Sequence, residues 1–185
     1  MTDRAEMEAV LEAVLFVAAE PVTGERLREL FTEQELQHFD AALEEVLRRY
    51  SPGAGQGVFI EEVAGGLRLV TRPELNAYLR KFFEVTGRSR LSLAALETLA
   101  IVAYRQPITG PEVQELRGVN SAGVLKTLLE RRLVRISGRK QVVGKPFLYR
   151  TTREFLMHFG LESLEDLPPL EEFEEAFGAD EAEPQ

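Results

Sequence analysis

Few residues in this chain of 185 have the type and spacing that enzyme chemistry requires. Its two histidines, His38 and His158, fall in separate halves of the sequence, and there is no cysteine to join either of them. A zinc site or a nucleophile–base pair needs several such groups close together, so isolated histidines are typical of surface or capping positions. Gly144-Lys145-Pro146 lacks the glycine-rich lead and the following Ser or Thr of a phosphate-binding loop. We therefore predict that the protein is not an enzyme and uses no cofactor or metal.

Binding chemistry is better represented, because basic side chains gather between residues 131 and 153. Such clusters suit nucleic-acid phosphates, whereas a solvated or partner-facing surface accounts for them without any nucleic acid. The stretch 120–130 offers only Lys126 and a few small polar groups to base edges, so we expect DNA contact to be weak or indirect. The candidate DNA or phosphate contacts are Arg135, Arg139, Lys140, Lys145 and Arg150.

Tyr104 is the aromatic residue that stands out as a candidate contact for a protein partner. It lies off the apolar stripe of its helical stretch, beside Arg105 and Gln106. An aromatic ring with a polar tip is frequent at interfaces, although a core position suits Tyr104 equally well.

Charge is distributed in three blocks beneath the net charge of −9. Residues 1–84 carry 16 acidic and 9 basic groups, residues 85–160 carry 5 and 13, and residues 161–185 carry 10 acidic groups and no basic ones. These blocks indicate segments with different surface roles. No run approaches the ~18 apolar residues of a membrane span, and the N-terminus does not resemble a signal peptide. We expect a cytoplasmic protein with no membrane contact.

A four-residue phrase occurs twice, as PVTG at 21–24 and as PITG at 107–110, each time after an apolar stretch of helical periodicity. Proline pushes the preceding residue out of the α region and so ends the first helix. Thr23 and Thr109 then stand where the next helix needs its N-cap, and Glu112 completes a capping box in the second copy. At an offset of 86, the stripes predicted to face the core are Val10, Ala13, Val14 and Val17, aligned with Leu96, Leu99, Ala100 and Ala103.

Each copy continues with a third helix, a β-hairpin and a closing helix. The third helices begin at capping residues, Thr32 in the first copy and Asn120 or Ser121 in the second. The period then changes from 3.6 to 2, which indicates strands. Three helices and a hairpin are typical of a helix-turn-helix core with a wing, so we predict an α+β, mainly α fold of two tandem winged-helix domains. The predicted strands are 58–63 with 67–72 and 133–136 with 147–152, and the closing helices are 73–84 and 153–160.

The composition places a domain boundary in the polar stretch 87–90. We predict an N-terminal winged-helix domain over 1–86 and a C-terminal one over 87–160. An acidic tail follows over 161–185, and we expect it to be partly disordered.

The second copy closely resembles the segregation and condensation protein B family of bacteria. Four runs carry the resemblance, namely AYRQPIT, RGVN, GRK and TTREFL, all between residues 103 and 156. The likeness extends weakly over the first copy and covers about residues 6–172.

This resemblance implies a non-catalytic subunit of the bacterial SMC–kleisin complex that acts in chromosome condensation and segregation at the nucleoid. It implies a homodimer, formed mainly through the N-terminal domain, that binds the kleisin, segregation and condensation protein A, and reaches the SMC ATPase through it. A DNA-binding transcriptional regulator is the alternative that the basic second copy keeps open. The off-stripe aromatic and the small residues that open the third helix give the candidate kleisin contacts Tyr104, Arg105, Asn120, Ser121 and Val124.

Overall fold

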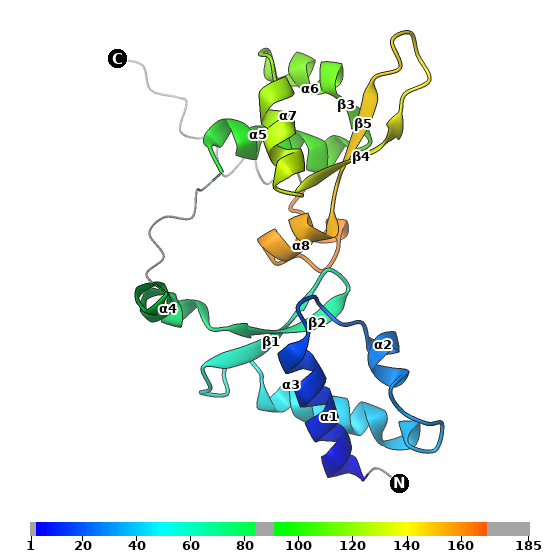
Figure 1. Cartoon of the computed structure of the whole chain (residues 1–185), viewed down its shortest axis with the longest axis vertical. Coiled ribbons are helices and arrows are strands. Elements are labelled where there is room, and N and C mark those ends of the chain that lie inside the picture. Colours follow the sequence, from blue (N-terminus) through cyan, green and yellow to red (C-terminus); the bar gives the residue numbers. More distant parts are fainter. Residues whose placement is uncertain (1–2, 84–90, 170–185) are drawn as a thin grey trace.

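The computed structural model describes residues 3–83 and 91–169 (Figure 1). It is a mixed, mainly helical structure in which each of these two segments encloses its own hydrophobic cluster. The predicted boundary around residues 87–90 and the distal part of the acidic tail lie outside the described residues. The N-terminal segment contains α1 (Arg4–Val17), α2 (Gly24–Arg28), η1 (Leu36–His38), α3 (Phe39–Arg49), β1 (Val58–Val63), β2 (Gly66–Thr71), η2 (Pro73–Leu75) and α4 (Asn76–Phe82).

The C-terminal segment repeats this order with a longer sheet. Its strands β3, β5 and β4 form one antiparallel sheet, with β5 in the centre. Its elements are α5 (Leu93–Arg105), β3 (Ile108–Thr109), α6 (Gly110–Arg117), α7 (Ala122–Glu130), β4 (Val134–Arg139), β5 (Phe147–Thr151), α8 (Arg153–Phe159) and η3 (Leu164–Asp166).

The predicted core stripe of α1 was wrong except at Val14, which packs partly buried against the core, because the ungapped offset of 86 does not hold along the helices. The buried residues of α1 are Met7, Leu11 and Leu15, whereas Val17 is 75% exposed. The extended C-caps Ala18 and Gln106 lie 88 positions apart, but Pro21 and Pro107 lie 86 apart. Two additional residues therefore separate α1 from its proline, and α1 ends before proline can act on it.

The same correction applies to part of α5. Leu99 and Ala103 are buried as predicted, but Leu96 is 41% exposed and Ala100 is also exposed. The buried face of α5 is instead formed by Ala95, Thr98, Leu99, Val102 and Ala103.

The two PxTG phrases are confirmed as starts of helices. The Thr23 hydroxyl accepts the Arg26 amide, and Thr109 forms the full capping box with Glu112. The phrase also supplies an edge strand, which the sequence did not predict. Ile108 pairs with Tyr149 of β5, and Val22 forms an isolated bridge with Leu67 of β2. Each phrase therefore ties its helical corner to the hairpin.

Both predicted hairpins are present. Ala64 and Gly65 have φ values of 51° and 69°, as a two-residue turn between β1 and β2 requires. In the second hairpin β4 continues to Arg139, past the predicted end at 136, with an irregularity in register between Ile136 and Gly138. The closing helices are shorter than predicted, with α4 ending at Phe82 and α8 at Phe159.

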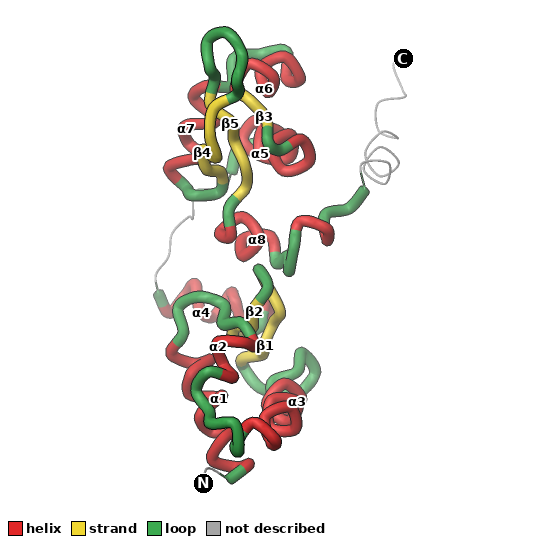
Figure 2. Tube along the Cα trace, turned by 90° about the vertical axis from the view of Figure 1, so that its right-hand side faces the viewer, coloured by secondary structure: helices red, strands yellow, loops and turns green. Residues whose placement is uncertain are grey.

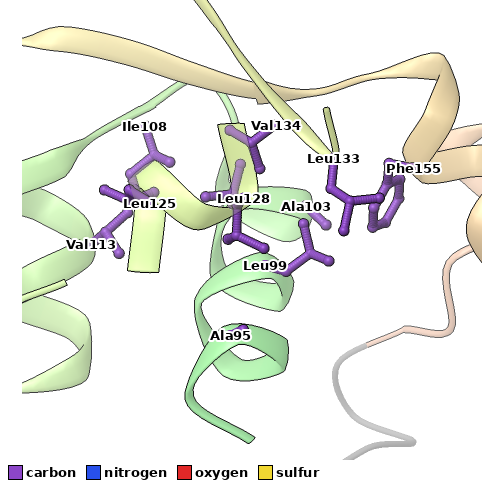
Figure 3. Close-up of a cluster of buried hydrophobic side chains, with 11 residues drawn as sticks. Ala95, Leu99, Ala103, Ile108, Val113, Leu125, Leu128, Leu133, Val134 and Phe155 are labelled. Carbon is purple, nitrogen blue, oxygen red and sulfur yellow. The ribbon is translucent and has the colours of Figure 1, made fainter. Parts of the chain in front are cut away.

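The C-terminal core gathers on α5 and α7, beneath the sheet. Figure 3 shows Leu99 of α5 and Leu128 of α7 pointing toward one another, with Leu133 and Phe155 closing one side. Phe155 is brought to the core because Thr152 caps α8, where its hydroxyl accepts the Phe155 amide. This packing fixes α5, α6 and α7 relative to the β4–β5 hairpin.

The two segments meet through α8 and the turn of the first hairpin (Figure 2). The Ala64 amide donates to the Leu161 carbonyl at 2.8 Å. Arg153, the first residue of α8, donates to the Pro21 carbonyl at 2.9 Å and lies 3.9 Å from the Glu20 carboxylate.

Candidate partner-binding surfaces

The C-terminal end of α5 holds the first two predicted contact residues. Arg105 is exposed, whereas Tyr104 is half-buried and its hydroxyl donates to the Pro168 carbonyl at 2.6 Å. Gln106 fixes this end of the helix, because its side-chain oxygen accepts both the amide and the hydroxyl of Thr151 at 2.9 and 3.0 Å. The start of the acidic tail therefore lies against Tyr104, while the Arg105 side chain remains open to a partner.

An exposed apolar stripe runs along α5 toward Tyr104. Leu93, Leu96, Ala100 and Tyr104 follow the 3-and-4 spacing of one helix face, which borders the buried face at Leu99 and Ala103. A second apolar face on a helix that already buries one face is unusual for a surface exposed to water. We interpret the outer face of α5 as a surface that a partner covers.

Arg117 connects α5, α6 and α7. Its side chain is only 9% exposed, and one of its guanidinium nitrogens lies 3.0 Å from the Glu97 carboxylate. Another donates to the Ser121 hydroxyl at 3.3 Å, whereas Nε is buried with no partner among the described atoms. The next residue, Gly118, ends α6 with φ of 68°, a conformation that favours glycine. Arg117 therefore belongs to the framework of the segment.

The other three predicted kleisin contacts lie at the start of α7, in different environments. Asn120 is exposed, and its side chain caps the helix by accepting the Ala122 amide at 2.9 Å. Ser121 is 1% exposed and bonded internally to Arg117 and Val119, so its side chain is not available to a partner. Val124 is half-buried against the core.

The predicted kleisin contacts fall into two groups, one at the C-terminal end of α5 and one at the start of α7. Glu97, which Arg117 ties to α7, lies seven residues before Tyr104, or about 10 Å along the helix at ~1.5 Å per residue. An open depression of about 570 Å³ lies between α6, the start of α7 and β5, and the lining residues Gly118 and Ala122 flank Asn120 in the sequence. Its lining residues are Gly110, Pro111, Gln114, Glu115, Gly118, Ala122, Leu125 and Tyr149.

The five predicted phosphate contacts all lie on the β4–β5 hairpin, but the fold already uses two of them. The Arg139 guanidinium stacks 4.0 Å from the centre of the Phe147 ring and donates to the Lys145 carbonyl. Lys140 forms an ion pair with Glu112. Arg135 and Arg150 instead face one another across the ladder, and both are exposed.

Glu112 links the hairpin to the start of α6. The Lys140 ammonium, followed by the hydroxyl and amide of Thr109, lowers the pKa of the Glu112 carboxyl to about 2. Its carboxylate therefore keeps its charge across the physiological range and holds α6 to the loop end of the β4–β5 hairpin.

The N-terminal segment exposes aromatic residues on α4, a helix with no buried residue that lies to one side of α1 and α3 in Figure 1. Tyr78, Phe82 and Phe83 are all largely exposed, and the last two rings contact one another edge to face. Such an aromatic surface is typical of a protein interface.

No group of side chains suited to hold a metal ion occurs within residues 3–83 and 91–169. His38 lies at the start of α3 and His158 near the end of α8, so the structure does not bring the histidines into one element. Among the described helices, none has the length and apolar character to cross a membrane.

Comparison with known proteins places the chain in a family. The family model described as segregation and condensation complex subunit ScpB matches residues 9–170. The chain belongs to the ScpB family. A segregation and condensation protein B of Halalkalibacterium halodurans is 49% identical over 96% of this chain and 90% of its own length.

Two solved structures of ScpB proteins also match. ScpB from Mycobacterium tuberculosis is 37% identical over 87% of this chain and 99% of its own, with a TM-score of 0.40. A dimer of a ScpB N-terminal domain complexed with ScpA peptide is 26% identical over 40% of this chain and 91% of its own, with a TM-score of 0.35.

In this member of the family, the residues in the runs that carry the family likeness mostly form internal connections. Gln106 of AYRQPIT and Thr152 of TTREFL bond to β5 and α8, and Arg117 and Asn120 of RGVN fix α6 and α7. The sequence pattern did not define the outer face of α5, and it named Arg135 and Arg150 without showing that they are paired across the ladder.

Proposed function

We propose that this protein is a non-catalytic subunit of the bacterial SMC–kleisin complex, which acts in chromosome condensation and segregation in the cytoplasm at the nucleoid. As a homodimer it binds the kleisin, segregation and condensation protein A, and through it the SMC ATPase. The observation that carries this proposal is the match to the ScpB family over residues 9–170. The exposed apolar faces of α4 and α5 support a role based on protein contacts.

The architecture that we propose is a pair of winged-helix domains, 1–86 and 87–160, followed by an acidic tail. Each segment has the order helix, edge pairing, helix, helix, hairpin, which supports it; the edge pairing is the strand β3 in the C-terminal segment and the Val22–Leu67 bridge in the N-terminal one. On this scheme β1–β2 and β4–β5 are the wings, and α3 and α7 take the place of recognition helices.

The kleisin contact that we propose is the outer face of α5. A helical or extended kleisin segment would cover Leu96 and Ala100 and end at Tyr104, where Arg105 would bind a carboxylate. Asn120 and Val124, at the start of α7, would form a second contact beside the depression.

Co-purification with the kleisin tests this face. Ala100→Arg places a charged side chain in the middle of the stripe without touching the core, so we expect at least ~10-fold weaker binding, as for loss of a central contact. Ala41→Arg is the matched control, because Ala41 is an exposed alanine on α3 in the other segment. Equal affinity of both variants and the wild type would remove the α5 face from the proposal. Tyr104→Ala and Arg105→Glu then test whether the C-terminal end of this α5 face contributes to kleisin binding.

The dimer contact that we propose is the aromatic face of α4. Phe82→Glu introduces a charge there while leaving the buried cluster of the N-terminal segment intact. Light scattering after size exclusion is expected to give a monomer for this variant and a dimer for Leu93→Glu, an equally exposed change in the C-terminal segment. A dimeric Phe82→Glu variant would place the dimer contact elsewhere.

A sequence-reading transcriptional regulator is not favoured. Lys126 is the only cation on α7, where it lies 3.8 Å from Glu130. Direct readout requires several side chains that reach base edges, and the small residues at the start of α7 do not supply them.

A further inference from the structure

The β4–β5 hairpin carries a pair of arginines that its own fold does not explain. Arg135 and Arg150 are directly opposite residues of the antiparallel ladder. Side chains at such positions have Cβ atoms roughly 4.5–5.5 Å apart, and like charges placed there are destabilising. No hydrogen bond or ion pair joins either side chain to any described residue. An anion that binds between them would remove the repulsion.

The charge around this pair is of one sign. Residues 131–153 contain eight arginines and lysines and no aspartate or glutamate. Two carboxylates on neighbouring helices are already paired, Glu112 with Lys140 and Glu130 with Lys126, and Glu154 follows the hairpin on α8. The hairpin therefore presents a positive surface although the whole chain carries a net charge of −9.

The available cations extend along the hairpin rather than surrounding a pocket. Arg135 and Arg150 lie toward its base, and Lys145 lies in the loop, five residues before Arg150 and so at most about 17 Å from it at ~3.3 Å per extended residue. The loop that joins β4 to β5 projects away from the body of the segment (Figure 1), and Val142 and Val143 of this loop are exposed. The depression beside α6 is lined by Glu115 and by no cation, so it is not the anion site.

We propose that the β4–β5 hairpin binds the phosphate backbone of duplex DNA without reading its sequence, with Arg135 and Arg150 as a clamp on one strand. A linear array of cations matches a duplex, which carries about one charge per 1.7 Å of axis. The exposed valines suit a shallow contact in the minor groove. This inference goes beyond binding of the kleisin and does not depend on it.

The expected salt dependence follows from the cations that remain available. Within the described residues, Arg132, Arg135, Lys145 and Arg150 have side chains without an internal partner. Four phosphate contacts give a slope of log K against log salt of about −3.6, so that affinity falls roughly 150-fold between 50 and 200 mM salt. Without the arginine pair the slope is about −1.8, and the same change of salt costs only about 12-fold.

Fluorescence anisotropy of the full chain with a labelled 20-base-pair duplex tests the proposal. The variant is Arg135→Gln with Arg150→Gln, and the matched control is Arg26→Gln with Arg28→Gln, which removes two exposed cations from α2. We expect the hairpin variant to lose about half the salt slope, the control to keep it, and duplexes of different sequence to bind alike. Thermal unfolding serves as the check of folding, since removing the repulsive pair is expected to keep or raise Tm.

Three results would overturn the proposal. The first is no duplex binding by the wild type at 50 mM salt, and the second is an equal loss of slope in the control. The third is a hairpin variant that loses binding to a polyglutamate peptide but keeps its binding to the duplex. This result would assign the hairpin to an acidic protein partner. Kleisin co-purification by the hairpin variant is expected to be unchanged, so failure here is distinct from failure of the proposed function.

Discussion

Replacement of Glu112 by glutamine separates the charge of this residue from its hydrogen bonds. Glutamine still accepts from the amide and hydroxyl of Thr109, which donate to the carboxylate at 2.8 and 2.7 Å, so the capping box survives. The ion pair with Lys140 is lost. Any loss of stability in E112Q therefore measures the attachment of α6 to the hairpin.

The magnitude follows from the pKa of Glu112. A fall from 4.5 to about 2 corresponds to about 3.4 kcal/mol at ~1.36 kcal/mol per unit, which is an upper bound. The Glu112 and Lys140 side chains are 38% and 45% exposed, so solvent screening reduces the expected contribution to about 1 kcal/mol. Because folding lowers this pKa, the stabilisation is complete above pH 4.5 and is lost as the pH falls toward 2.

Urea unfolding of wild type and E112Q at pH 7 and pH 3 checks this reasoning. We expect a difference in free energy of unfolding of about 1 kcal/mol at pH 7 and a much smaller difference near pH 3. Lys140→Gln is the partner control, and its loss is expected to vanish when it is combined with E112Q. A difference that stays the same at both pH values would refute the assignment of the stabilisation to the charge on Glu112.

Two further predictions concern the framework. Leu99→Ala is expected to cost about 2–5 kcal/mol in urea unfolding and Leu96→Ala about 1 kcal/mol or less, since only Leu99 is buried; equal losses would contradict the observed register of α5. Gly118→Ala is expected to cost about 1–2 kcal/mol, because its φ is 68°. Gly123→Ala, inside α7, is expected to be neutral or to stabilise by up to about 1 kcal/mol. An added Cβ meets no atom within 4 Å at either glycine, so similar effects on Tm would argue against backbone conformation as the cause.

Local features of this fold could be predicted because their causes lie within a few residues of sequence. The capping box of Thr109 and Glu112 spans four residues, and the change of period from 3.6 to 2 marks both hairpins. The end of α1 could not be predicted in this way. Ala18 and Ala19 are good helix formers, so the sequence contains no sign that the helix stops at Val17.

Features that depend on distant partners could not be predicted from spacing. The Arg117 side chain is nearly buried in the folded protein, where it contacts Glu97. These two residues are 20 positions apart in sequence and come together only when α5 and α6 pack. The strand β3 forms because β5, about 40 residues later, offers it an edge. The burial of Ser121 also depends on tertiary packing, which local spacing does not show. Its prediction as a partner contact therefore failed.

The contrast between internal and exposed residues limits what a family likeness can reveal about binding. Gln106, Arg117, Asn120 and Thr152 are tied to neighbouring elements, so in this chain they fix the geometry of α5, α6 and α7. They determine where a partner surface stands, but they do not supply its chemistry. That chemistry comes from side chains without internal partners, such as Arg135 and Arg150, and from the outer apolar face of α5. Differences between members in what they bind are therefore expected at these exposed positions, while substitutions at Arg117 or Gln106 act first through stability.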